Sequence, residues 1–90
     1  MSHKDDKRQI SDSQAEGYVS RFLKESKQGI LIELDNPMNT VEGAEARAWL
    51  HLEKIFLSLD FNENQLQKAR KALNKRVEEL ARDHPRHKTK

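Results

Sequence analysis

The chain has 90 residues, of which 34% are hydrophobic and 36% charged, and its formal net charge is +2. A chain of this length forms one domain at most, and its small core supplies only ~3–5 kcal/mol. The absence of cysteine excludes disulfides, thiolate chemistry and cysteine-based zinc sites. No stretch approaches the ~20 apolar residues of a membrane span. We expect a soluble cytoplasmic protein, marginally stable alone or completed by a partner.

The N-terminal part predicts a polar tail and then a helix. Residues 1–9 are wholly polar and are expected to be a disordered tail. Ser11 and Ser13 are each followed three residues later by Gln or Glu, so either can begin a capping box. With Gly29 as a C-terminal signal, we predict a first helix at about 13–27. Its apolar stripe consists of Ala15, Tyr18, Val19, Phe22 and Leu23.

Residues 30–34 have a different spacing of apolar residues from the helical stripe that precedes them. Isoleucine and leucine recur there with a period of two, between a glycine and the Asp-Asn-Pro turn signal at 35–37. The pattern predicts a short strand or extended segment. No second strand is visible in the sequence, so a strand would have to pair with a second copy or a partner. Alternatively, the segment would pack on the helices as an extended connector.

The segment that follows predicts a central helix at about 40–59 with two apolar faces. A broad face consists of Ala48, Trp49, Leu52, Ile55, Phe56 and Leu59. Leu50 and Leu57, seven residues apart, form a narrow second stripe nearly opposite, which Ala46 and Gly43 extend. A helix with two apolar faces needs two surfaces to pack against.

A third helix is predicted at about 63–82, with Asp60 or Asn62 as its cap. Its narrow apolar stripe consists of Leu66, Ala69, Leu73, Val77 and Leu80. The short link makes the second and third helices antiparallel neighbours. We therefore predict an all-α fold: a single helical domain at 10–83 built from three helices, followed by a basic tail at 84–90.

The first and third helices can each bury their apolar stripe against the broad face of the central helix. Leu50 and Leu57 then remain exposed to water. Trp49 lies at one edge of the broad face and is expected to anchor either the core or an interface. We predict a homodimer, with an interface formed by Leu50, Leu57, Trp49, Leu31 and Ile32. The corresponding function is that of a small non-catalytic regulator or adaptor, which binds itself and a further, unidentified protein through an apolar helix surface.

The sequence indicates no catalytic chemistry. His51 has Arg47 and Lys54 as its helical neighbours, so no metal-ligand partner lies at the required spacing. Glu42 and Glu45 lie on polar helix surface, where nothing would separate their pKa values for acid–base work. We expect no enzyme activity, no metal or other cofactor and no small-molecule substrate.

A basic stripe lies opposite the apolar face of the third helix and continues into the tail. It consists of Lys68, Lys71, Lys75, Arg82 and Arg86. Such a stripe is typical of phosphate contact by nucleic-acid-binding proteins, and equally of a solvated helix face. DNA binding is therefore the alternative prediction.

The predicted order of strand, helix and helix over residues 29–82 resembles, in outline, the ribbon-helix-helix repressors. The resemblance implies a dimer whose paired strands read the major groove of DNA. Leu31 and Glu33 would occupy the outward strand positions, where that family carries polar or basic side chains. The helix at 13–27 would be an addition to that topology.

Overall fold

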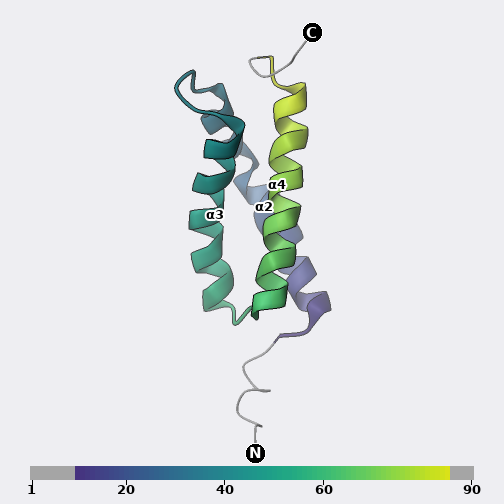
Figure 1. The fold of residues 1–90 in the computed structure, drawn as a ribbon. Helices are drawn as coiled ribbons and strands as arrows, with labels where there is room; N and C mark the ends of the chain where they lie inside the picture. The colour runs from purple at the N-terminus through teal and green to yellow at the C-terminus, as the bar shows by residue number, and fades with distance from the viewer. Residues whose placement is uncertain (1–9, 86–90) are drawn as a thin grey trace, which may run out of the picture.

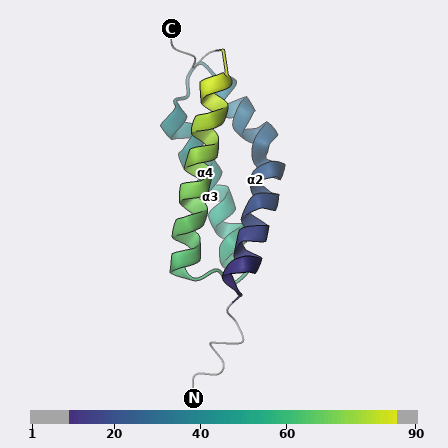
Figure 2. The same cartoon turned by 90° about the vertical axis from the view of Figure 1, so that its right-hand side faces the viewer.

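The computed structural model describes residues 10–85, and this part of the chain consists of three α-helices without a strand (Figure 1). Helix α2 spans Asp12–Asp35, α3 spans Val41–Ser58 and α4 spans Glu63–Asp83. The helices run up, down and up, side by side, and each contacts the other two (Figures 1 and 2). The all-helical prediction is thus confirmed.

The prediction of a strand or extended segment at 30–34 is wrong, because α2 continues through these residues. Ile30 and Leu34, one helical turn apart, are only 2% and 0% exposed, whereas Ile32 between them is 68% exposed. Positions 30 and 34 satisfy a period of two and a helical i, i+4 spacing equally well. Continuity with the stripe that begins at Ala15 favours the helix, which therefore extends well beyond the predicted end at 27.

Helix α2 begins at the earlier of the two predicted caps. The backbone N–H of Gln14 donates to the Ser11 hydroxyl oxygen over 3.0 Å, and the N–H of Ser11 donates to Gln14 Oε1 over 3.1 Å. This reciprocal capping box satisfies two backbone donors at the helix start.

Helix α3 is capped by Thr40, whose hydroxyl accepts from the N–H of Gly43 over 2.9 Å. At its other end Asp60 adopts a left-handed conformation with φ of 69°. The N–H of Phe61 donates to the carbonyl of Phe56, and that of Asp60 to the carbonyl of Leu57. This is a Schellman motif. It turns the chain so that the Phe61 ring stacks on Phe56, with centroids 4.5 Å apart.

Helix α4 begins with the capping box of Asn62 and Gln65, one of the two predicted caps. The Gln65 side chain is 3% exposed, yet its amide nitrogen donates to the carbonyl of Ile10 and to the carboxylate of Asp12. The start of α4 is thereby tied to the start of α2. At the opposite end, His84 Nε2 lies 3.6 Å from a carboxylate oxygen of Asp35.

The core lies along the axis of the bundle and receives side chains from all three helices. Trp49 is 8% exposed and therefore belongs to this core. Its ring lies 6.2 Å from that of Phe56, which also contacts Phe22 and Phe61. The fully buried side chains are those of Phe56, Leu34, Leu52, Leu73 and Val77.

Candidate interaction surface

The side of α3 that faces away from the bundle carries two exposed leucines. Leu50 is 62% exposed and Leu57 is 53% exposed. The other side of the same helix contributes Trp49, Leu52 and Phe56 to the core. We call the exposed side of α3, with Leu50 and Leu57 at its centre, the outer face.

The five predicted interface residues do not come together in the structure. Trp49 is buried in the core, while Leu50 and Leu57 lie on the outer face of α3. Leu31 is half-buried and Ile32 exposed on a different helix, α2. Only the two leucines of α3 therefore form a common surface.

A shallow groove of about 440 Å³ separates the outer face from α4. The Arg70 guanidinium lies 5.9 Å from the centroid of the Trp49 ring beside it, within range of a cation–π interaction. Leu57 and Leu66 add apolar surface from either side. The complete lining is Trp49, Glu53, Leu57, Phe61, Glu63, Leu66, Gln67 and Arg70.

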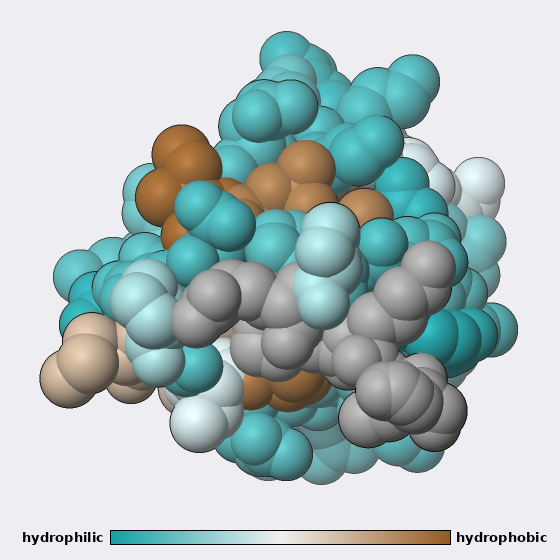
Figure 3. Space-filling view, turned by 90° about the horizontal axis from the view of Figure 1, so that it is seen from above, coloured by the Kyte–Doolittle hydropathy of each residue, from teal (hydrophilic) through white to brown (hydrophobic). Residues whose placement is uncertain are grey.

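The upper end of the bundle carries smaller apolar patches. Figure 3 looks down on this end and shows hydrophobic side chains emerging in separate places among hydrophilic ones. Ile32 is 68% exposed near the end of α2, and Met38 is 89% exposed in the connection to α3. Single exposed apolar side chains are ordinary on protein surfaces, so this end is a weaker candidate than the outer face.

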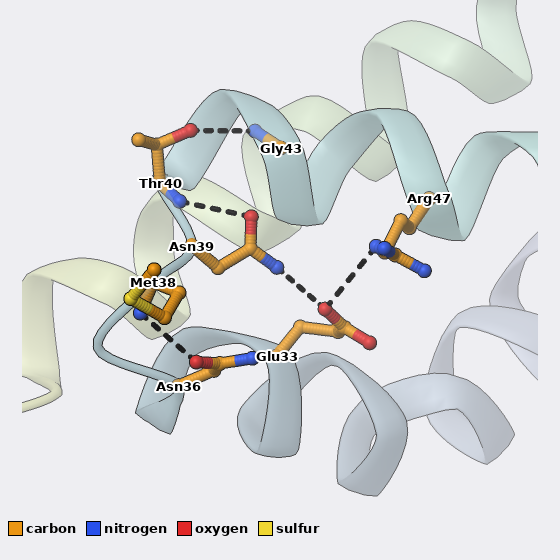
Figure 4. A network of polar contacts seen from close by, with 7 residues as sticks. All are labelled: Glu33, Asn36, Met38, Asn39, Thr40, Gly43 and Arg47. Carbon is orange, nitrogen blue, oxygen red and sulfur yellow. Dashed lines mark hydrogen bonds and ion pairs between the residues drawn. The ribbon is translucent and has the colours of Figure 1, made fainter.

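A polar network holds α2 against α3 at the same end (Figure 4). One Glu33 oxygen accepts a hydrogen bond from the Asn39 amide and lies 3.6 Å from Nε of Arg47. Asn39 in turn accepts from the N–H of Thr40. Asn39 lies just before Thr40, the cap of α3, and joins the two helices.

Gly43 has no side chain, and the polar network occupies the space that a side chain at this position would need. A Cβ at position 43 would collide with the side-chain oxygen of Asn39 and press on the hydroxyl of Thr40. The glycine is thus accounted for by packing against the cap. The sequence contained one signal of this arrangement, a Thr followed three residues later by a Gly, but no pattern that identified Glu33 and Arg47 as partners of the turn.

Glu45 lies on the flank of α3 that faces α4. Burial raises the pKa of its carboxyl above the ordinary value, and the nearby carboxylates of Glu78 and Glu42 raise it further, while Arg70 opposes the change. The ionised form of the Glu45 carboxyl is therefore less favourable in the folded protein than in the unfolded chain. Among the described residues, no group of three or more potential ligands is placed to hold a metal ion.

The two described histidines lie in different surroundings. His51 is exposed and lines an open groove between α2 and α3 together with Glu25, Glu33 and Arg47. His84 is half-buried at the end of α4 beside Asp35. The structure thus brings His51 to the same groove as two carboxylates from α2, which its sequence neighbours did not indicate.

The predicted basic stripe lies on the solvent side of α4. Lys68, Lys71, Lys75 and Arg82 are all exposed, opposite the buried Leu73 and Val77. Arg86 and the rest of the predicted tail beyond Pro85 lie outside the described residues, as do residues 1–9. The strand that a ribbon-helix-helix arrangement requires is helical here, so the topological resemblance to that family is not supported.

Comparisons with protein-family models, with curated proteins and with solved structures gave no match to this chain.

Proposed function

We propose that this protein is a non-catalytic interaction protein, an adaptor or regulator, and that the outer face of α3 is its main binding surface. The observation that carries the proposal is the exposure of Leu50 and Leu57 on a helix whose opposite side packs Trp49, Leu52 and Phe56 into the core. Large aliphatic side chains in register along one helix face are the usual anchors of helix-to-helix recognition.

A second copy of the chain is the first occupant that this surface fits. Fully burying a leucine stabilises by about 1.5–3 kcal/mol, and a domain of this size has only ~3–5 kcal/mol from its core. Covering Leu50 and Leu57 on both copies would therefore add substantially to the stability of the fold. A twofold pair lets the same patch cover itself without requiring another protein.

A further protein partner would use the surface that such a pair leaves free. Ile32 and Met38 lie at the connection between α2 and α3 and do not belong to the outer face. Within residues 10–85, they are the large apolar side chains that remain exposed after Leu50 and Leu57 are covered.

Thermal unfolding at several protein concentrations tests the proposal. If folding is coupled to pairing, each tenfold increase in concentration raises the melting temperature by roughly 3–5 °C, because association stabilises the native state by mass action. Leu57→Glu should remove this dependence, and Lys71→Glu, on the solvent side of α4, should keep it. A melting temperature that is constant over a hundredfold range of parent concentration contradicts the proposed self-association.

DNA binding by α4 is the second candidate, favoured by the four exposed basic side chains on one side of that helix. Replacing Lys68, Lys71 and Lys75 together by Gln should change the free energy of unfolding by no more than about 0.5 kcal/mol, because exposed charges contribute little to stability. The same variant should bind a DNA duplex more weakly, with a salt slope flatter by up to about 0.9 per lysine. Fluorescence anisotropy at two salt concentrations measures both effects, and a parent that does not bind at low salt excludes this candidate.

A further inference from the structure

The side of the bundle formed by α2 and α4 carries a groove, on the far side of the molecule from α3. Figure 2 looks onto this side, where the two helices lie next to each other with α3 behind them. Two hollows of about 310 and 440 Å³ follow one another along the groove, and Ser20 and Ala72 line both of them. From Asp12 to Lys24 the groove extends about 18 Å, which is the length of a helix of about twelve residues.

The floor of the groove is apolar and only partly covered. Val19 and Leu23 of α2 line the lower and the upper hollow, and both are half-buried. Ala72 of α4 is half-buried where the hollows join, and Ala69 is buried below it. Such a floor gains free energy by contact with hydrocarbon side chains, and its short alanines let another helix approach closely.

The lower hollow, at the end where α2 and α4 begin, has an excess of negative charge. Asp12 and Glu16 line it from α2, and Lys68 lines it from α4. The Asp12 carboxylate accepts a hydrogen bond from the Gln65 amide, and Glu16 is exposed. Glu16 is therefore available to a basic group of a partner.

The upper hollow has an excess of positive charge. Lys24 of α2 and Lys75 of α4 line it, and both side chains are exposed. Neither lysine forms an ion pair within residues 10–85. Arg76 and Glu79 line the same hollow but offset each other, since Nη1 of the arginine lies 3.6 Å from Oε1 of the glutamate. Two unpaired ammonium groups from different helices therefore meet at one site.

The change of sign along the groove distinguishes between classes of anionic partner. A DNA duplex or an anionic membrane presents negative charge throughout, so Asp12 and Glu16 would repel its phosphates at the lower end. Phosphates also gain nothing from an apolar floor. An amphipathic helix can place apolar side chains along the floor, acidic residues at one end and basic residues at the other.

We propose that the α2–α4 groove binds an amphipathic helix of a partner protein. The apolar side of this helix packs on the floor, its acidic residues pair with Lys24 and Lys75, and its basic residues pair with Glu16. The site goes beyond the proposed outer face of α3 and does not depend on it. A chain that pairs through α3 and also binds a helix here connects two copies of its partner, as an adaptor does.

A synthetic peptide of about fourteen residues is a suitable probe, because it spans the groove as a helix. Its leucines recur at intervals of three and four, with glutamates beside them in one half and lysines in the other half. A second peptide has the same composition and the same leucines, but its glutamates and lysines alternate throughout. Fluorescence anisotropy at low salt should give the first peptide a dissociation constant roughly tenfold lower than that of the second.

Substitutions in the groove should weaken binding of the first peptide. Lys24→Gln and Lys75→Gln should each raise the dissociation constant about threefold, and together about tenfold, because each removes one exposed ion pair. Ala72→Gln should raise it roughly tenfold, since the longer side chain fills the junction of the two hollows. Lys71→Gln, on the solvent side of α4 outside the groove, is the matched control and should change it less than about twofold.

Weaker binding by the groove variants, with Lys71→Gln like the parent, supports the site. Equal binding of the two peptides, or no binding at about 1 mM peptide, overturns it. A parent that binds a DNA duplex or phosphatidylserine vesicles more tightly than the peptide, with Lys71→Gln as damaging as Lys75→Gln, also overturns it. Leu57→Glu, on the outer face of α3, should bind the peptide like the parent, so failure at one surface leaves the other intact.

Discussion

The two sides of α3 both carry large apolar side chains but lie in opposite environments. Trp49, Leu52 and Phe56 on the inner side are at most 8% exposed, whereas Leu50 and Leu57 on the outer side are more than half exposed. The difference arises because α2 and α4 together surround only one side of α3. A helix that is apolar on two sides in a three-helix bundle therefore has one surface more than the bundle can cover.

Trp49 should show the largest effect of any single residue on the inner side. We expect Trp49→Ala to reduce the free energy of unfolding by about 3–5 kcal/mol, since it removes a buried aromatic side chain and leaves a cavity. The matched outer-side change, Leu50→Ala, should alter it by less than about 0.5 kcal/mol. In a Leu57→Glu background, where pairing is absent, helical circular dichroism in increasing urea should show a cooperative transition for Leu50→Ala and none for Trp49→Ala, whose expected loss equals the stability of the domain. Equal losses for the two variants would contradict the assignment of the sides.

Asp60 follows the end of α3, where the chain turns back towards the inner side of that helix. Its left-handed conformation is unfavourable for a residue with a side chain. Asp60→Gly should therefore increase the free energy of unfolding by up to about 1 kcal/mol. Asp60→Ala, which keeps a Cβ but loses the polar side chain, serves as the control and should not be stabilising. Destabilisation by glycine at this position would be inconsistent with the Schellman motif.

Glu45, on the flank between the two sides, should show the smallest effect. Because the pKa of Glu45 is raised in the folded protein, the folded state binds its proton more tightly than the unfolded state. Its contribution to stability therefore falls as pH rises from the ordinary pKa through the raised one. Glu45→Gln should be more stable than the parent by a few tenths of a kcal/mol at pH 7, because the site is partly exposed and screened. Denaturation at pH 4 and pH 7 should show the advantage only at the higher pH.

The two faces of α3 could be predicted from the sequence because a 3.6-residue period determines both of them locally. The caps at Ser11 and Asn62 were predictable for the same reason, although each had a competing alternative. The helical conformation of residues 30–34 could not be predicted, because Ile30 and Leu34 fit both the period of two of a strand and the i, i+4 spacing of a helix. Only packing against the rest of the bundle distinguishes the two conformations.

The polar network at the α2–α3 connection was beyond prediction for a different reason. Glu33 lies six residues before Asn39 and fourteen before Arg47, and each of the three is an unremarkable surface residue by sequence. They meet only because the turn reverses the chain. Gln65 is similar, since its contacts with Ile10 and Asp12 cross more than fifty residues of sequence.

Sedimentation equilibrium tests most directly whether a second copy covers the outer face of α3. The parent protein should have a mass close to twice that of the 10.5 kDa chain. Leu57→Glu should have the mass of one chain and retain most of its helical circular dichroism, while Lys71→Glu should remain paired. A parent protein with the mass of a single chain at millimolar concentration would contradict the account.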